Sequence, residues 1–256
     1  MVKLSKRLQT IADFVPEGSR LADIGSDHAL LPVYLAERGR ILSAVAGEIA
    51  DGPLQAAARQ IREAGLGSRI DVRKGDGLSV LQPGEADAVT IAGMGGALIV
   101  QILQQGKPKL GGVRKLILQP NVAEDHVRRW LKENDWLLEE ESLLEEDGKY
   151  YEVLAAVQHP RAQQQNQELY RPRKLTDQVT MTEEWLLRLG PHLSARPSPL
   201  FFAKWQGELE KLDMIIAGMA KAETEAARIR RKELSEQRNM LEEVLSCLQK
   251  DKRSFN

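Results

Sequence analysis

Sulfur and imidazole side chains are scarce in this 256-residue chain, which has one cysteine, Cys247, and four histidines. A single thiol cannot form a disulfide within the chain, and so few Cys and His side chains do not build a dedicated zinc site. We therefore expect no disulfide framework and no metal.

Long apolar runs and an excess of one charge are also missing. No window approaches the roughly 18 uninterrupted apolar residues that span a membrane, and the first ten residues lack the apolar centre of a signal peptide. Lys and Arg number 36 against 37 Asp and Glu. A balanced total gives little support for a nucleic-acid partner, because phosphate binding depends on clustered Lys and Arg. We expect a soluble cytoplasmic protein without a membrane partner.

Between residues 20 and 158, short runs rich in Val, Ile and Leu alternate with segments of helical period. This pattern is typical of βαβ units around a parallel sheet. A Glu-Asp-Gly turn at 146–148 separates the last two strands, so we expect the seventh strand to be antiparallel. Helices are predicted to begin near His28, Gly52, Gly95 and Ala123. The predicted strands are 21–24, 42–47, 70–73, 88–92, 115–118, 137–143 and 151–157.

No strand-like run follows residue 160, and the remainder is predicted to be helical. Apolar residues recur at coiled-coil-like spacings over 175–193 and again over 205–219, continuing less cleanly to 248. The Gly- and Pro-rich stretch 190–199 separates the two segments, which predicts an antiparallel helical hairpin. A single helix over 201–250 or a break near Gly218 both stay open. We expect a catalytic domain over 1–160 and a helical domain over 161–256.

The first predicted strand ends in Asp23-Ile24-Gly25-Ser26-Asp27-His28, where doubly wound sheets bind nucleotides. A dinucleotide site would show G-x-G-x-x-G here, but this loop has one glycine and an added acid. Carboxylates disfavour a diphosphate and favour a cation. The loop therefore fits S-adenosylmethionine, which carries a sulfonium and no phosphate.

Three further strand ends carry residues suited to that cofactor. Glu48 ends the second strand, where a carboxylate can accept both ribose hydroxyls. Asp76 and Gly77 follow the third strand, and this acid is predicted to accept from the adenine amino group. Gly93 and Met94 offer bare backbone after the fourth. Taken singly, each could be a turn glycine or a helix-capping acid. Their joint order favours a class I methyltransferase.

Several stretches of the sequence resemble a known family, the bacterial tRNA (adenine(22)-N1)-methyltransferases, TrmK. The resemblance covers essentially the whole chain, although only the catalytic domain carries specific motifs. Leu30 departs from it, since we expect Tyr there. The matching stretches are 4–8 (LSKRL), 23–32 (DIGSDHALLP), 91–96 (IAGMGG) and 118–121 (LQPN).

The resemblance implies a Rossmann-like domain, with a seven-stranded sheet, that binds S-adenosylmethionine, followed by a coiled-coil-like helical domain. The implied reaction methylates the ring N1 of adenine 22 in the D-arm region of tRNA. The expected cofactor contacts are Asp23, Gly25, Ser26, Asp27, His28, Glu48, Asp76, Gly77, Gly93 and Met94. The expected substrate contacts are Lys6, Arg7, Gln119, Pro120 and Asn121, with Asp27 and Asn121 as the candidate catalytic residues.

The residues agree with a ring nitrogen as acceptor. Enzymes that methylate an exocyclic amine commonly carry an Asn- or Asp-Pro-Pro-aromatic motif after the fourth strand, where this chain has Ala92-Gly93-Met94-Gly95. A ring N1 already has an in-plane lone pair, so catalysis needs positioning and stabilisation of the cationic product. Asp27 is the candidate for the second task. Asn121 could read an adenine edge or cap the next helix, and His28 could line the pocket or cap its helix.

Charge is distributed unevenly along the chain. Residues 161–256 hold 17 Lys and Arg against 14 Asp and Glu, whereas 1–160 hold 19 against 23. Local basic clusters could track tRNA phosphates or could simply be solvated helix faces. The Glu-rich stretch 139–146 is expected to be a solvated strand without chemistry, and Trp130 and Trp136 are expected in the core. The basic clusters are Lys3, Lys6 and Arg7; Arg171, Arg173 and Lys174; and Arg228, Arg230, Arg231 and Lys232.

Two other hypotheses stay open. The first is a class I methyltransferase that acts on a different RNA, a protein or a small molecule and uses the helical domain as a docking arm. The second is a non-catalytic scaffold that dimerises through its helices, against which Asp23, Glu48 and Asp76 argue. The oligomeric state is not determined by the sequence, and a monomer is favoured.

Overall fold

The computed structural model describes residues 2–219 and 224–254, and the chain divides into two compact units between Glu168 and Leu169. The division falls eight residues after the predicted domain boundary, because the first unit includes most of α6 (Ala162–Leu169). Asn166 of this helix is buried and donates to the carbonyl of Trp136 at 2.9 Å.

A seven-stranded sheet forms the centre of the first unit, in the order β3-β2-β1-β4-β5-β7-β6. β1 to β5 run parallel, and β7 pairs antiparallel with both β5 and β6, which confirms the predicted sheet and its antiparallel seventh strand. The strands are β1 (Ser19–Ile24), β2 (Ile41–Glu48), β3 (Ile70–Lys74), β4 (Ala88–Met94), β5 (Lys115–Pro120), β6 (Trp136–Glu146) and β7 (Lys149–Gln158).

The turn between β6 and β7 is the predicted two-residue hairpin. Glu146 pairs with Lys149, and both central residues have positive φ, 51° at Asp147 and 69° at Gly148. Asp and Gly are the residues that adopt this conformation at least cost, and its twist matches that of the flanking strands.

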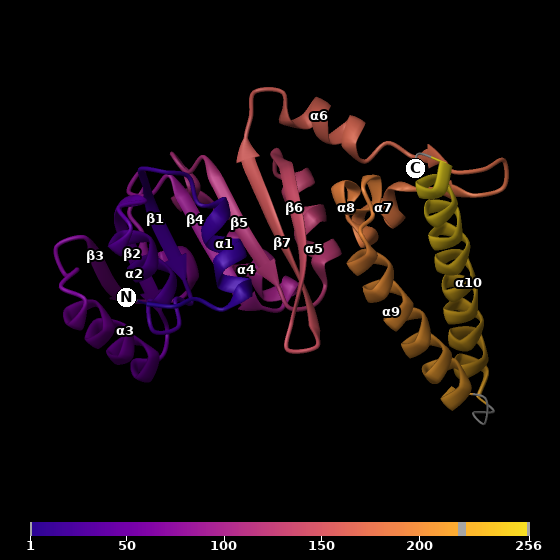
Figure 1. Ribbon diagram of the computed structural model, residues 1–256, viewed down its shortest axis with the longest axis horizontal. Coiled ribbons are helices and arrows are strands. Elements are labelled where there is room, and N and C mark those ends of the chain that lie inside the picture. The colour runs from indigo at the N-terminus through magenta and orange to yellow at the C-terminus, as the bar shows by residue number, and fades with distance from the viewer. Residues whose placement is uncertain (1, 220–223, 255–256) are drawn as a thin grey trace. The chain divides into compact units, whose positions relative to one another are not determined.

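Five α-helices cover the two faces of the sheet (Figure 1). α1 (Lys6–Phe14), α2 (Leu30–Glu37) and α3 (Asp51–Glu63) pack on one face, and α4 (Gly96–Gln105) and α5 (Glu124–Glu133) pack on the other. The last four begin within two residues of their predicted starts. Two short 3₁₀ helices lie in connections of this unit: η1 (Gly77–Val80) between β3 and β4, and η2 (Lys107–Leu110) between α4 and β5.

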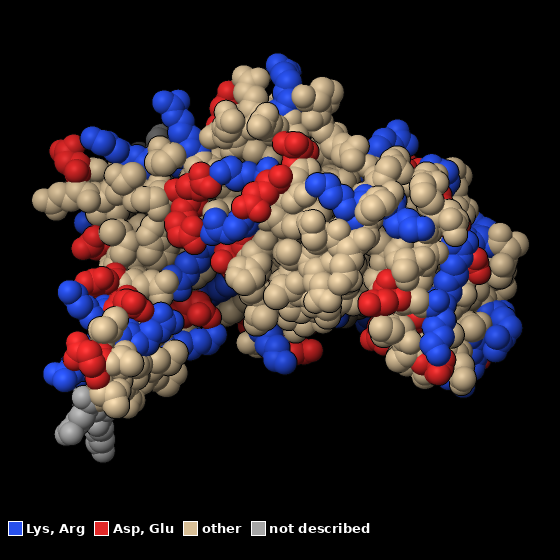
Figure 2. Space-filling view, turned by 180° about the vertical axis from the view of Figure 1, so that it is seen from behind, with Lys and Arg blue, Asp and Glu red and all other residues tan. Residues whose placement is uncertain are grey.

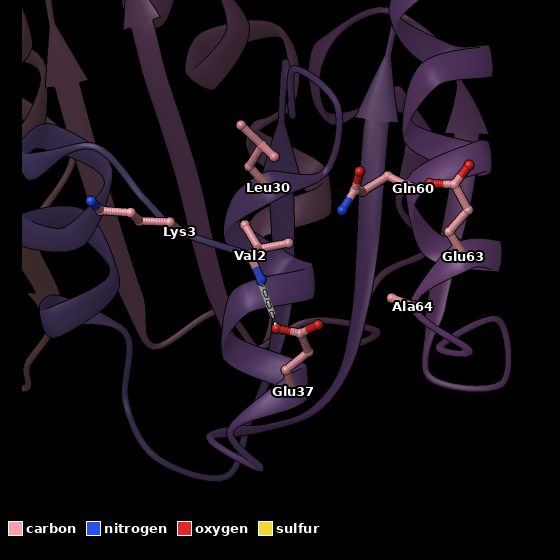
Figure 3. A pocket seen from close by; sticks show the side chains of 7 residues that line it. All are labelled: Val2, Lys3, Leu30, Glu37, Gln60, Glu63 and Ala64. Carbon is pink, nitrogen blue, oxygen red and sulfur yellow. Dashed lines mark hydrogen bonds between the residues drawn. The ribbon is translucent and has the colours of Figure 1, made fainter.

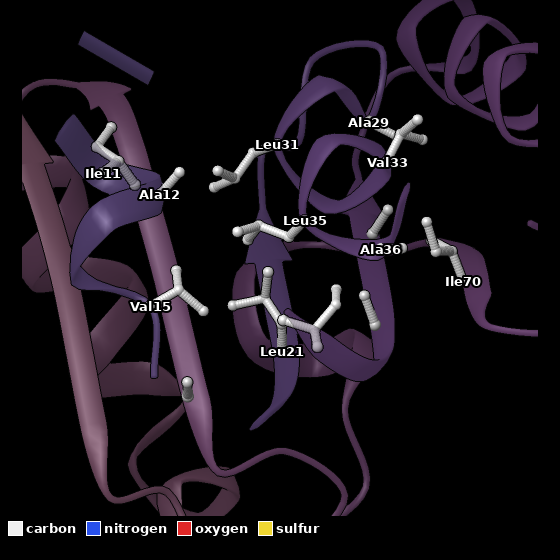
Figure 4. Close-up of a cluster of buried hydrophobic side chains, with 14 of the residues drawn as sticks. Ile11, Ala12, Val15, Leu21, Ala29, Leu31, Val33, Leu35, Ala36 and Ile70 are labelled. Atoms are coloured by element: carbon white, nitrogen blue, oxygen red, sulfur yellow. The ribbon is translucent and has the colours of Figure 1, made fainter. Parts of the chain in front are cut away.

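The core beneath α1 and α2 is purely apolar (Figure 4). Ile11 and Ala12 of α1 are fully buried in the same cluster as Leu31 and Leu35 of α2. At about 25 cal/mol per Å² of apolar surface removed from water, this burial fixes α1 against the sheet. The N-terminal helix is thus part of the core of the first unit.

A buried ion cluster corrects the expectation that the whole Glu-rich stretch 139–146 is solvated. The side chains of Glu141 and Arg128 are fully buried, and Arg128 Nε donates to Glu141 Oε1 at 2.6 Å. Arg128 also pairs with the equally buried Glu152 of β7. Strand alternation turns Glu141 inward and Glu140 outward, and the register irregularity between Leu138 and Glu140 leaves Glu139 exposed as well. Trp130 and Trp136 are buried, as predicted.

The second unit corrects two expectations from the sequence. Residues 173–181 form a small hairpin of β8 (Arg173–Lys174) and β9 (Thr180–Met181), although no strand was predicted after residue 160. The predicted helical segment 175–193 contains only α7 (Glu183–Leu189) and α8 (Pro191–Ala195). Thr182 starts α7, because its hydroxyl accepts from the Trp185 N–H and caps the helix.

The antiparallel helical pair lies further along the chain than predicted. It consists of α9 (Pro199–Gly218) and α10 (Glu225–Ser254), which pack against each other (Figure 1). α9 ends at Gly218, so of the two open alternatives the break is correct. Arg238 of α10 holds the pair together at the surface, donating to Asp213 of α9 at 2.9 Å.

Candidate functional site

The loop after β1 adopts an unusual backbone conformation. Gly25 has φ +69°, and the next residues with positive φ are Asp27, His28 and Ala29, at 35°, 63° and 56°. Left-handed conformation costs a non-glycine residue roughly 1 kcal/mol or more, and such strain concentrates at functional sites. Ala29 is the N-cap of α2. His28 is therefore not the helix cap, and its side chain is 56% exposed on the loop surface.

Asp23 supports this loop from below. It is buried, and its two carboxylate oxygens accept from the Ser26 hydroxyl at 2.5 Å and the Thr90 hydroxyl at 2.6 Å. Burial raises the pKa of the Asp23 carboxyl above its ordinary value, while these two hydrogen bonds lower it and the nearby carboxylates of Glu48 and Asp27 raise it further. Sequence reasoning missed Thr90, whose only signal is a hydroxyl within an apolar strand.

Glu48, at the end of β2, holds the strained part of the loop. Its carboxylate accepts from the Asp27 N–H at 2.6 Å. Burial raises the pKa of Glu48, the hydrogen bond from Asp27 lowers it, and the Asp27 carboxylate raises it. The side chain of Asp27 itself is 83% exposed. Three carboxylates from two adjacent strand ends therefore lie together, which disfavours an anion and suits a cationic ligand.

A β-bulge at the end of β4 forms the next part of the site. The register with β5 shifts between Ala92 and Met94, and Gly93 in the bulge has φ +75°. Side chains from β5 and the residue after it satisfy the bulge: the Gly93 N–H donates to Gln119 Oε1 at 3.1 Å, and the Gly93 carbonyl accepts from Asn121 Nδ2 at 2.8 Å. Asn121 does not cap α5, whose N-cap is Ala123.

Gln119 is a correction to the predicted substrate contacts. It is fully buried, so it does not reach an RNA base. Its Oε1 accepts from Arg7 Nη1 at 2.6 Å, and its Nε2 donates to the Pro120 carbonyl at 2.8 Å and to Asn121 Oδ1 at 3.1 Å. Pro120 is also buried. Asn121 is exposed and is the member of this group that a substrate can touch.

Arg7 and Lys6 link α1 to the site and to the β6–β7 turn. The Arg7 guanidinium lies 5.5 Å from the ring centroid of Tyr151 and donates to Gln119, so its contacts are within the protein. Lys6 is exposed, and its Nζ donates to the Glu145 carbonyl at 3.1 Å. The Glu146 carboxylate accepts from the N–H groups of Lys6 and Arg7 at the start of α1. Neither Glu146 nor Tyr151 could be assigned this role from the sequence.

The third strand end and the position of Leu30 complete the rim. Asp76 is exposed and begins η1, and Gly77 has φ +51°, with Ile102 side-chain atoms 2.9 Å from where a Cβ would lie. Leu30 lines a separate pocket with Val2, Lys3 and Gln60 (Figure 3). The Val2 N–H donates to Glu37 there, at 3.0 Å. Leu30 therefore lies at the junction of the loop and the N-terminal segment.

The donor set fits S-adenosylmethionine. Gly25 has no side chain to separate a ligand from the loop backbone, and a Cβ at this position would lie 2.3 Å from the Met94 methyl group. Buried acids at the ends of β1 and β2 complement a cation, and a single loop glycine with an added Asp does not suit a diphosphate. Within residues 2–219 and 224–254, no group of three or more His, Cys, Asp or Glu could hold a metal ion, and no helix is long and apolar enough to cross a membrane.

This sheet order and these strand-end residues define a Rossmann-like, class I methyltransferase. Residues 21–243 match the family model TrmK, described as tRNA (adenine(22)-N(1))-methyltransferase, and the chain belongs to this family. The resemblance inferred from the sequence motifs is thereby confirmed.

Individual relatives agree over nearly the full length. A Bacillus subtilis (strain 168) protein named tRNA (adenine(22)-N(1))-methyltransferase is 45% identical over 245 residues, which cover 95% of this chain and 98% of that protein. The crystal structure of the B. subtilis m1A22 tRNA methyltransferase TrmK has a TM-score of 0.84 at 44% identity, covering 96% of this chain and 100% of that one. A Streptococcus pneumoniae putative tRNA (m1A22) methyltransferase, solved with S-adenosyl-L-methionine, has a TM-score of 0.78 at 39% identity, covering 96% and 100%.

Proposed function

We propose that this chain transfers a methyl group from S-adenosylmethionine to the N1 ring nitrogen of adenine 22 in tRNA. The observation that carries the proposal is the cluster of acids at the ends of β1 and β2, with Asp23 and Glu48 buried, in a chain of the tRNA (adenine(22)-N(1))-methyltransferase family. The bulge at Gly93 stands where an enzyme acting on an exocyclic amine would carry its Pro-Pro-aromatic motif.

Each strand end has a separate task in holding the cofactor. Gly25 lets the ligand approach the backbone, and Asp23 holds Ser26 in place beneath it. Glu48 fixes the Asp27 N–H and offers its other oxygen to ribose hydroxyls. Exposed Asp76 and Gly77 follow the neighbouring strand, where they can meet the adenine. His28 and Met94 flank the ligand from the β1 and β4 loops. When bound, S-adenosylmethionine supplies an electrophilic methyl group on a sulfonium.

The protein's contribution to the reaction is placement and charge. Adenine N1 attacks with an in-plane lone pair, so no proton has to leave first and no strong base is needed. Methylation makes the ring cationic. The exposed Asp27 carboxylate, held on the strained loop, stabilises that charge. Asn121, beside the Gly93 bulge, positions the base.

The proposed partner is tRNA, bound by residues of both units. Lys3 and Lys6 are exposed on the N-terminal segment, and Arg228, Arg230 and Lys232 are exposed on α10. Their surface ion pairs, such as Arg230 with Glu233 at 3.0 Å, are worth little and can be exchanged for phosphates. Lys and Arg lie among Asp and Glu over much of the surface in Figure 2. We further propose a cytoplasmic monomer, which light scattering of the purified protein would test.

The decisive experiment is methyl transfer to unmodified tRNA followed by nucleoside analysis. Wild-type protein should yield 1-methyladenosine, and tRNA with adenine 22 replaced by guanine should yield none. Methylation of an exocyclic nitrogen would contradict the proposed reaction. Methylation of a protein fraction but of no tRNA would favour the docking-arm alternative, and failure to bind S-adenosylmethionine in calorimetry would favour a scaffold.

A further inference from the structure

A chain of hydrogen bonds leads from Arg7 of α1 through Gln119 to Asn121 beside the Gly93 bulge, and each donor and acceptor in it can be assigned. Arg7 Nη1 and the Gly93 N–H both donate to Gln119 Oε1, at 2.6 and 3.1 Å. A guanidinium and a backbone N–H can only donate. The oxygen of the Gln119 amide must therefore face them, and its nitrogen must face the other way.

The same logic fixes the orientation of Asn121. Gln119 Nε2 can only donate, so the Asn121 atom 3.1 Å away must be the acceptor Oδ1. Asn121 Nδ2 then faces the Gly93 carbonyl, which can only accept, at 2.8 Å. The Pro120 carbonyl, which accepts the second Gln119 N–H at 2.8 Å, reinforces this polarity. Neither amide can flip without placing donors against donors, or acceptors against acceptors.

Asn121 keeps unused hydrogen-bonding capacity on its exposed side. A carboxamide has two N–H donors and two acceptor lone pairs, and one of each is engaged in the bonds to Gly93 and Gln119. One donor and one acceptor are left without a partner among the described residues. Both belong to the exposed carboxamide of Asn121, which follows β5 next to the Gly93 bulge at the end of β4.

A paired donor and acceptor on one amide match one edge of adenine well. Asn reads adenine by accepting from the N6 amino group and donating to N7. That contact leaves N1 unused, whereas any pairing along the Watson–Crick edge would occupy the reacting atom. We infer that Asn121 binds the target adenine through its N6 and N7 atoms, and that Gln119 and Arg7 are positioning residues that hold the amide in the required orientation. This inference rests on the proposed function and specifies how its base is recognised.

The test uses tRNA carrying either adenosine or 7-deazaadenosine at position 22, in which a C–H group replaces N7. Wild-type enzyme should show about tenfold lower kcat/KM on the deaza substrate, the loss of one good hydrogen bond. In Asn121→Ala, kcat/KM on adenosine should fall at least as much, because both base contacts are lost, and the further penalty for the deaza base should disappear, which leaves a ratio set by the intrinsic reactivity of the two bases. Because the comparison is a double-mutant cycle, the intrinsic reactivity of the two bases cancels.

Gln119→Glu separates positioning from folding. Its carboxylate can still accept from Arg7 and the Gly93 N–H but cannot donate to Asn121. We expect a lower melting temperature, because a carboxylate oxygen replaces the N–H that faces the Pro120 carbonyl, but an unchanged Kd for S-adenosylmethionine, while kcat falls severalfold and discrimination against the deaza base shrinks. Arg7→Lys should preserve more discrimination than Arg7→Met.

The outcomes distinguish this inference from the proposed function. A ratio of kcat/KM on the two tRNAs that is the same in the wild-type enzyme and in Asn121→Ala would overturn the contact to N7 while leaving the reaction intact. If Asn121→Ala still discriminated fully between adenosine and 7-deazaadenosine, Asn121 would not be the residue that contacts N7. If Gln119→Glu still discriminated fully, Gln119 would not position Asn121. Absence of methylation of the adenosine tRNA by the wild-type enzyme would instead refute the proposed function. Should Asn121→Ala fail to fold, the wild-type and Gln119→Glu measurements still decide.

Discussion

At the scale of single residues, the loop after β1 combines backbone strain with close packing. Gly25 satisfies both requirements, since it has φ +69° and no Cβ to meet Met94. The three left-handed residues that follow at 27–29 have no such freedom, and the Glu48 carboxylate holds the first of them. The loop 25–29 reads as ordinary turn residues in the sequence, but in the structure its backbone is constrained.

Gly25→Ala should reduce S-adenosylmethionine affinity at least tenfold while lowering stability by only about 1 to 2 kcal/mol, the cost of left-handed backbone in alanine. The new Cβ would fall 2.3 Å from a flexible Met94 methyl, which can move, but it would also separate a ligand from the loop backbone. Titration calorimetry and thermal melts measure the two effects.

Gly39→Ala is the matched control for this substitution. Gly39 also has φ +69°, and nothing lies within 4 Å of its Cβ position. It should show the same loss of stability with unchanged ligand affinity. Equal ligand affinity in both variants would mean that Gly25 is needed only for the left-handed backbone conformation and not for ligand binding.

The raised pKa values of Asp23 and Glu48 predict how cofactor binding depends on pH. Burial raises both, so a growing share of these carboxyls is protonated as the pH falls from 7.5 toward 5. A protonated acid carries no charge for a cation. S-adenosylmethionine should therefore bind severalfold more weakly at pH 5, and the sulfonium-free product S-adenosylhomocysteine should lose less.

Glu48→Gln should flatten this pH dependence, because the variant has no carboxyl to titrate at this position. Glu63→Gln, which changes an exposed acid on α3, should leave it as in the wild type. The measurement is Kd by calorimetry across pH 5 to 7.5 for both ligands. A parallel loss of affinity for the two ligands would show that the carboxylates do not sense the sulfonium.

At the scale of helices and strands, the sequence predicted the sheet well because its inner parallel strands are buried on both faces. β1 to β5 read as short apolar runs, a signal that needs no tertiary information. The helix predicted over 175–193 was wrong because apolar residues spaced alternately four and three apart also fit a hairpin followed by a capped helix. Leu175 and Val179 take part in the hairpin through the bond from the Leu175 N–H to the Val179 carbonyl.

The site was predictable only where chemistry and strand ends coincide. Asp23 and Glu48 could be placed because each ends a parallel strand, and such ends meet at one edge of the sheet. The sequence could not show that Gln119 is buried, since its partner Arg7 is 112 residues away. Glu141 looked like its exposed neighbours for the same reason: its partner Arg128 lies on another element.

The buried cluster of Arg128, Glu141 and Glu152 joins α5 to the β6–β7 hairpin. Arg128→Met should destabilise the protein by about 3 to 5 kcal/mol, because it leaves two carboxylates buried without this guanidinium. Chemical denaturation should show the loss as a lower midpoint with an unchanged slope. Glu140→Gln on the exposed face of β6 should change stability by less than about 0.5 kcal/mol. If Arg128→Met left the free energy of unfolding unchanged, the buried cluster would add no stability.

At the scale of the whole molecule, a net charge of −1 is compatible with binding tRNA because the charges are distributed by task. Acids concentrate in the catalytic unit, where they meet a cationic cofactor, and residues 161–256 carry the basic excess. Affinity should then come from a few phosphate contacts and should fall steeply with salt. We expect the logarithm of the association constant to decline linearly with the logarithm of salt concentration.

The α10 cluster should account for part of that slope. Neutralising Arg228, Arg230 and Lys232 together as Gln should reduce the slope by about 2 to 3, since each phosphate contact contributes roughly 0.7 to 0.9. These side chains are exposed and, among the residues that the structure describes, form local ion pairs with Glu225, Glu233 and Glu236, so the fold should tolerate their loss. Lys211→Gln on α9 is the single-site control, and its slope should match that of the wild type. If the triple variant keeps the full slope, tRNA contacts the protein elsewhere, and the exposed lysines of the N-terminal segment become the next residues to neutralise.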